Sequence, residues 1–149
     1  MGNFSGEAEG EKMNEIQFIV RGVPVPQGST RAFVVKGRAI TTNKTPALVA
    51  WRHAIAEEAR KVAPPSLWEG ALNVTCYFQF EPLKSRKKQG MTHFQRPDID
   101  KLLRAVLDAC TGVIWKDDAQ VQILRGQKVY QSPPRCSIWI RRCIYEDEK

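Results

Sequence analysis

The sequence predicts a single α+β domain in which a mixed β-sheet packs against two main helices. Several short segments alternate apolar and polar residues, as half-buried strands do. Two longer segments repeat apolar residues every three or four positions, as helices that bury one face do. The chain has 149 residues, of which 42% are hydrophobic, and this is enough for one core. We expect the domain at residues 16–145, between a disordered acidic tail at 1–15 and an acidic C-terminal tail at 146–149.

The first elements follow from alternation and from turn residues. A strand is expected at Ile16–Arg21. Two prolines in the next segment withhold backbone donors and break regular structure. Residues 28–31 of this loop leave room for a phosphate to approach the backbone beside Arg31, although a plain surface loop is the simpler interpretation. A hairpin with its turn at Lys36-Gly37 is expected to follow.

The first main helix is expected over Thr45–Val62. Its first residue is a favourable N-cap, and Pro46 suits the first helical position. Apolar residues recur along one stripe that includes Trp51, so we expect this tryptophan in the core. A pair of prolines ends the helix. Residues 72–80 then alternate without interruption, which predicts a strand with one buried face.

The second main helix is expected to begin no earlier than Pro97, because a proline disfavours helical backbone in the preceding residue. Gly112 suits the left-handed conformation that commonly ends a helix. Strands are then expected at residues 120–124 and 129–130, and a final strand at 135–145.

The charge of the chain suits a polyanionic partner. The formal net charge is +7, and residues 16–145 alone contain 21 basic and nine acidic side chains. Five of those nine are aspartates between Asp98 and Asp118. A nuclease needs such a basic body with one acidic spot, because cations hold phosphates while carboxylates hold a metal. Charge alone is equally consistent with a merely soluble basic protein.

The aspartates lie at the two ends of the second helix. If the step from Asp98 to Asp100 is extended, their carboxylates lie on one side of the chain. A reversal near Gly112 can then bring Asp117 and Asp118 back towards them. Clustered carboxylates require a cation, and hard oxygen ligands favour Mg²⁺ or Mn²⁺.

Each of these aspartates also has a purely local interpretation. Asp98 suits an N-cap. Asp100 suits the first turn of a helix, where an acid is favourable, and an ion pair with Arg104 one turn later. The pair Asp117-Asp118 suits a turn before a strand. The spacing of the aspartates leaves these alternatives open.

Two longer segments, Arg96–Ala109 and Gly112–Val121, resemble the signature of the RusA family of small bacterial and prophage Holliday junction resolvases. The proline-containing loop at 22–28 and the order of the elements are similar as well, so that the resemblance covers residues 16–145. It implies a RusA-like fold and a homodimer. It also implies a cytoplasmic, bacterial or phage-encoded Mg²⁺-dependent endodeoxyribonuclease, with Mn²⁺ as a possible substitute, that resolves four-way DNA junctions in recombination and repair.

By this resemblance, the metal ligands are Asp98, Asp100 and Asp118. Asp117 is then a turn residue, and Asp108 lies on the helix surface. Seven basic residues are expected to contact the DNA backbone. Four of them lie in the loop at 84–90, for which a solvated surface loop without DNA contacts is nearly as good an interpretation. The seven are Arg31, Lys84, Arg86, Lys87, Lys88, Arg96 and Lys101.

Two positions depart from the family pattern. The family commonly has Asn where this chain has Lys101, and a functional Lys where it has Arg104. Arginine binds phosphate well but is a poor proton donor. We therefore expect Arg104 to act in catalysis by stabilising phosphate charge.

Other functions remain possible from the sequence. The chain could be a catalytically silent or broader branched-DNA-binding protein of the same fold, or an adaptor whose basic face binds acidic proteins. The four cysteines and two histidines do not form a zinc motif. Cys76 and Cys110 lie on apolar faces, so buried free thiols are favoured. No apolar run reaches the ~20 residues that span a membrane, so a cytoplasmic protein without a membrane partner is expected.

Overall fold

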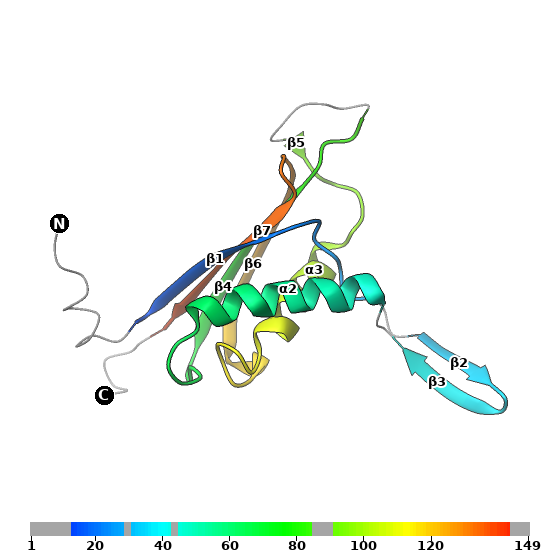
Figure 1. The fold of residues 1–149 in the computed structure, drawn as a ribbon, viewed down its shortest axis with the longest axis horizontal. Helices are drawn as coiled ribbons and strands as arrows, with labels where there is room; N and C mark the ends of the chain where they lie inside the picture. The colour runs from blue at the N-terminus through cyan, green and yellow to red at the C-terminus, as the bar shows by residue number, and fades with distance from the viewer. Residues whose placement is uncertain (1–12, 29–30, 43–44, 85–90, 144–149) are drawn as a thin grey trace.

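The computed structural model describes residues 13–28, 31–42, 45–84 and 91–143. It confirms the predicted α+β domain with a mixed sheet and two main helices (Figure 1). Residues 1–12 of the tail expected at 1–15, and all of the tail expected at 146–149, lie outside the described residues. Glu15, which was expected in the first tail, begins β1. The elements follow in the order β1 (Glu15–Arg21), β2 (Arg31–Val35), β3 (Arg38–Thr42), α2 (Pro46–Val62), β4 (Leu72–Phe80), β5 (Met91–Thr92), α3 (Ile99–Cys110), a 3₁₀ turn η1 (Asp118–Gln120), β6 (Val121–Tyr130) and β7 (Arg135–Arg142).

The main sheet has five strands in the order β1-β7-β4-β6-β5. Strands β4 and β6 run parallel, and the other neighbouring pairs are antiparallel. The connection between the parallel pair contains α3, as a parallel connection requires a crossover. Strands β2 and β3 form a separate hairpin that extends beyond the start of α2 (Figure 1).

Helices α2 and α3 lie on one face of the main sheet (Figure 1), and the core fills the space between them. Strand β4 contributes every second side chain to this core, from Leu72 to Phe80. The predicted caps of α2 also form, because the hydroxyl of Thr45 accepts a hydrogen bond from the backbone N–H of Leu48 at 3.2 Å. Trp51 is buried, as its place on the apolar stripe predicted.

Helix α3 lies across β6 at a glycine. An added Cβ on Gly126 would come within 2.9 Å of Cδ1 of Leu103 and 3.1 Å of Cδ1 of Ile99. The two strand segments expected on either side of this residue are therefore one continuous strand, in which the glycine allows close approach of the helix. The helix ends as expected, since Gly112 follows it with a φ of 86°.

All four cysteines are free, and three of them are buried, as expected for structural thiols. Burial raises the pKa of Cys110, which removes its thiolate from any role at neutral pH. Among the helices that the structure describes, none is long and apolar enough to cross a membrane.

Candidate active site

Asp98 occupies the N-cap position of α3 but does not cap it. Its backbone is extended, with ψ of 139°, and its side chain makes no capping hydrogen bond. The helix begins at the next residue, Ile99, so the condition of an extended step to Asp100 is not met. Asp98 and Asp100 are both exposed. The local interpretation of Asp98 as a capping residue is therefore not supported by its hydrogen bonds.

The ion pair considered between Asp100 and Arg104 does not form, although both residues are described by the structure. The exposed ion pairs on α2, such as Arg60–Glu57 at 3.4 Å, show the kind of contact that is missing here. Neither carboxylate at the start of α3 is thus engaged in a local structural bond. Both are available to bind a ligand.

The loop that leads to Asp98 is fixed by β6. The ammonium of Lys128 donates hydrogen bonds to the carbonyl oxygens of Gln95 at 2.6 Å and Pro97 at 2.8 Å. The hydroxyl of Tyr130 donates to Oε1 of Gln95 at 2.8 Å. Charge-assisted hydrogen bonds are the stronger kind. Lys128 therefore holds the backbone directly before Asp98 against the sheet.

His93 supports the same loop from inside the protein. Its ring stacks on Tyr130 with ring centroids 4.3 Å apart. It also packs edge-to-face with Phe80, with ring centroids 4.8 Å apart. Burial, reinforced by the nearby charge of Lys128, lowers the pKa of His93. The imidazole is thus kept neutral as a packing group. Sequence patterns did not indicate this role, because no periodicity links residues 93, 128 and 130.

Asp118 is held at the other end of α3. Its Oδ1 contacts the hydroxyl of Thr111 and accepts a hydrogen bond from Nε1 of Trp115 at 3.1 Å. The same indole N–H lies 3.0 Å from Oγ1 of Thr111, and the Trp115 side chain is fully buried. Trp115 is anchored in the core, and the Thr111 hydroxyl lies 2.8 Å from the carbonyl oxygen of Leu107 at the end of α3, so both partners fix the direction of the Asp118 carboxylate. Neither was identified from the sequence, where Trp115 reads as one more apolar residue.

Asp117 has the structural role that was expected for it. Its side chain accepts from the backbone N–H of Ala119 at 2.9 Å and caps η1. Gln120 completes this capping box, accepting from the backbone N–H of Asp117 at 2.8 Å and donating to the carbonyl of Trp68 at 2.9 Å. The turn that carries Asp118 is therefore tied to the loop before β4.

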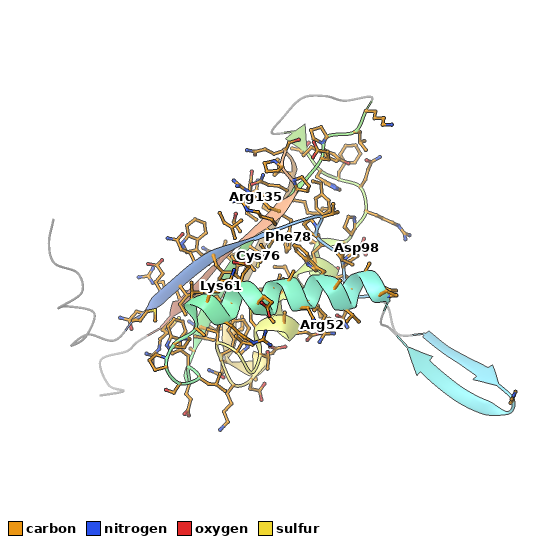
Figure 2. The ribbon with its side chains drawn as sticks, in the orientation of Figure 1. Arg52, Lys61, Cys76, Phe78, Asp98 and Arg135 are labelled. Carbon is orange, nitrogen blue, oxygen red and sulfur yellow. The ribbon has the colours of Figure 1, made fainter. Side chains whose placement is uncertain are left out.

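Asp108 differs from its expected place on the helix surface. It is partly buried, and this burial raises its pKa. The positive charge of Arg52 lowers the pKa, the negative charge of Asp118 raises it further, and Arg104 lowers it. Arg52 reaches this region from α2 (Figure 2). The sequence could not show this, because it does not reveal that α2 packs beside α3.

The carboxylates fit a hard divalent cation by their chemistry. Asp98, Asp100 and Asp118 offer oxygen ligands of the kind that Mg²⁺ and Mn²⁺ prefer. Within the described part of the chain, however, no three His, Cys, Asp or Glu side chains stand together as a metal-binding group. The two ends of α3 therefore carry the proposed ligands without bringing them to one point in this structure.

The basic residues expected at DNA are distributed around this region. Lys84, Arg96 and Arg104 are exposed, and Lys101 is partly buried. The loop at 22–28 reaches the same helix, since the backbone N–H of Gln27 donates to the carbonyl of Lys101 at 2.9 Å. The backbone of Arg31 begins β2. Three of the expected contacts, Arg86, Lys87 and Lys88, lie outside the described residues.

Comparison with known proteins supports the family suggested by the sequence. The profile of the family described as "Endodeoxyribonuclease RusA" matches residues 22–141, and the chain belongs to this family. It is also similar to "Uncharacterized protein YqaN" of Bacillus subtilis (strain 168), with 27% identity over 139 residues, 87% of this chain and 97% of that protein. The matched range contains every described element except β1 at its start and the last residue of β7, Arg142. The chain is thus a member of a family of endodeoxyribonucleases.

Proposed function

We propose that this protein is a Mg²⁺-dependent, structure-specific endodeoxyribonuclease that resolves four-way DNA junctions, with Mn²⁺ as a possible substitute. The observation that carries the proposal is family membership over residues 22–141 together with the two carboxylates at the start of α3 that have no local bond. Neither carboxylate is explained by a capping hydrogen bond or an ion pair, whereas Asp100 does lie in the first turn of α3, where the helix dipole favours an acid. We place the protein in the cytoplasm, where its DNA substrate would be.

Asp98, Asp100 and Asp118 would hold the metal, which would lower the pKa of a bound water and offset charge on the phosphate. The chain itself would do the positioning. Trp115 and Thr111 fix the direction of Asp118, while Lys128 holds the backbone before Asp98. Exposed Arg104, one turn beyond Asp100, would bind the phosphate and steady its developing charge.

DNA binding would rest on the basic surface around the start of α3. The backbone contacts we propose are Arg31, Lys84, Arg86, Lys87, Lys88, Arg96 and Lys101. Neutralising phosphates with these cations would make binding strongly dependent on salt. A homodimer would supply the two cuts that resolution of a junction requires, because a two-fold axis presents two equivalent sites.

The test is cleavage of a synthetic mobile four-way junction with Mg²⁺ by the wild type and by Asp100→Asn and Asp118→Asn. We expect both variants to bind the junction and to lose cleavage. Asp117→Asn is the matched control, since Asn also caps and the neighbouring carboxylate is untouched. Unchanged cutting by the first two variants would refute the assignment of the site.

A catalytically silent or broader branched-DNA-binding protein is the second candidate. It is favoured by one observation, namely that the described side chains do not form a ready metal-binding group. Under this alternative the wild type binds junctions tightly but cleaves none with Mg²⁺ or Mn²⁺. A panel of flap, fork and four-way substrates separates it from a nuclease of wider specificity.

A further inference from the structure

The face of the sheet that points away from α2 and α3 has its own chemistry. Strand register places Trp139 of β7 beside Thr75 of β4, and Thr75 beside Arg125 of β6, so all three point from the same face. The next row joins Ile19, Ser137, Tyr77 and Gln127 in the same way. We call these side chains of β1, β7, β4 and β6 the open face. Neither helix covers it, because α3 packs on the opposite side of β6 through Gly126.

The open face exposes large apolar and aromatic side chains. Trp139 and Ile19 are each 43% exposed, while Ile138 and Ile140, which point to the helices, are fully buried. A hollow of about 910 Å³ lies on this face, and Tyr77 and Trp139 are among the residues that line it. A tryptophan left in water at the centre of a sheet indicates a binding surface.

The charges of the open face are mainly positive. Arg125 and Arg135 line the hollow together with the amides of Gln79, Gln127 and Gln131, and none of its described lining residues is acidic. Arg135 projects from the start of β7 (Figure 2), where its Nε donates to Oε1 of Gln79 at 3.1 Å. The surface therefore combines flat aromatic rings, two guanidinium groups and amide donors. These groups suit a polyanion with flat apolar parts.

Single-stranded DNA combines these two properties. Unpaired bases stack on exposed aromatic side chains of a sheet, and arginines bind the phosphates between them. A second copy of this chain fits less well, because a two-fold interface centred on this face would bring its arginines against each other. Duplex DNA fits less well too, since its bases are already stacked and cannot reach a flat sheet.

We propose that the open face is a binding site for unpaired bases of single-stranded DNA, with Trp139 and Tyr77 as stacking platforms and Arg125 as a phosphate contact. The site is separate from the aspartates of α3, which lie at the ends of a helix on the other side of the sheet. Binding there needs no divalent metal and does not depend on cleavage. It would let a junction-binding nuclease also hold an unpaired strand.

Intrinsic fluorescence tests this proposal, because the other three tryptophans, Trp51, Trp68 and Trp115, are no more than 5% exposed. A mixed-sequence 20-nucleotide single strand, added to the full-length protein in EDTA, should quench the emission of Trp139. The matched duplex should compete weakly. Trp139→Leu should weaken binding by roughly 5-fold to 150-fold, the range expected for loss of one stacked base.

Three variants complete the experiment. Trp139→Phe should restore most of the affinity without the quenching signal, and Arg125→Gln should reduce the salt dependence of binding by about one phosphate contact. Val49→Ala, an exposed apolar position on α2, is the control that should leave binding unchanged. Variants are compared only after thermal melting shows that they are folded.

Several outcomes would overturn the proposal. These are an absence of quenching, equal affinity for the duplex, or unchanged binding by folded Trp139→Leu. A second copy on this face would instead protect Trp139 from acrylamide in the free protein, and Trp139→Glu would then reduce the molecular mass in solution. The proposed nuclease activity does not decide any of these results, so the two proposals can fail independently.

Discussion

Replacing Gly126 by alanine tests how α3, which carries Asp100 and Arg104, is seated on the sheet. The φ of Gly126 lies outside the left-handed region, so alanine can adopt its backbone conformation. Where no atom lies close to the glycine, replacing it with alanine stabilises a protein by about 0.4–1 kcal/mol, because alanine lowers the conformational entropy of the unfolded chain. The sign of the change therefore reports on the contact with the helix.

The contact is tight enough to reverse that sign. The new Cβ would lie 2.9 and 3.0 Å from the two Cδ atoms of Leu103 and 3.1 Å from Cδ1 of Ile99, against about 3.5–4.0 Å for ordinary carbon contacts. Overpacking of this kind costs about 1–3 kcal/mol. After the gain in the unfolded state, we expect a net loss of about 1–2 kcal/mol. For a chain of this length, that lowers Tm by roughly 2–8 °C.

A double-mutant cycle measures the contact directly. Urea unfolding gives the free energy of unfolding for the wild type, Gly126→Ala, Leu103→Ala and the double variant. Because Leu103→Ala removes the two nearest atoms that the new Cβ meets and leaves only Cδ1 of Ile99 at 3.1 Å, the cost of alanine at 126 should shrink in that background. Gln127→Ala, on the open face, is the control and should change stability by less than about 0.5 kcal/mol. An equal cost in both backgrounds, or a stabilised Gly126→Ala, would refute the packing argument.

Three further predictions follow from the site. Trp115→Phe removes the indole hydrogen bond to Asp118 and should lower the cleavage rate about 10- to 100-fold with little change in junction affinity, as measured by single-turnover cleavage and gel-shift titration. Lys128→Met removes the hydrogen bond that holds the backbone before Asp98 and should lower the cleavage rate by up to about 100-fold. A cleavage rate at the wild-type level would show that the loop does not need this hydrogen bond. The pKa of His93 is lowered in the folded protein. Below a pH of about 6.5 the unfolded chain therefore binds a proton that the folded protein excludes. The free energy of unfolding should fall as the pH falls from about 7 to about 5.5. His93→Phe should flatten that slope in urea titrations, whereas a slope identical to that of the wild type would exclude His93 as its source.

Local patterns in the sequence determined most of the secondary structure. Thr45 and Pro46 fixed the start of α2, and Gly112 fixed the end of α3, because caps act over one turn and depend on few neighbours. The uninterrupted alternation at residues 72–80 specified β4 to the residue. The two-residue strand β5 was not predicted, since two residues carry no periodicity and gain their place only by pairing with β6.

For the candidate site, the sequence identified residue types and a family, and tertiary structure decided their surroundings. The aspartates were visible because carboxylates are rare in this basic chain. Their supporting residues were not. Lys128 and His93 acquire their roles from neighbours that are distant along the chain, and Trp115 acquires its role from burial that holds its indole N–H against Asp118. The burial of Asp108 likewise depends on how α2 lies beside α3. Hydrophobic periodicity predicts which face of a helix or strand is buried. Which element packs against that face depends on the packing of the whole domain.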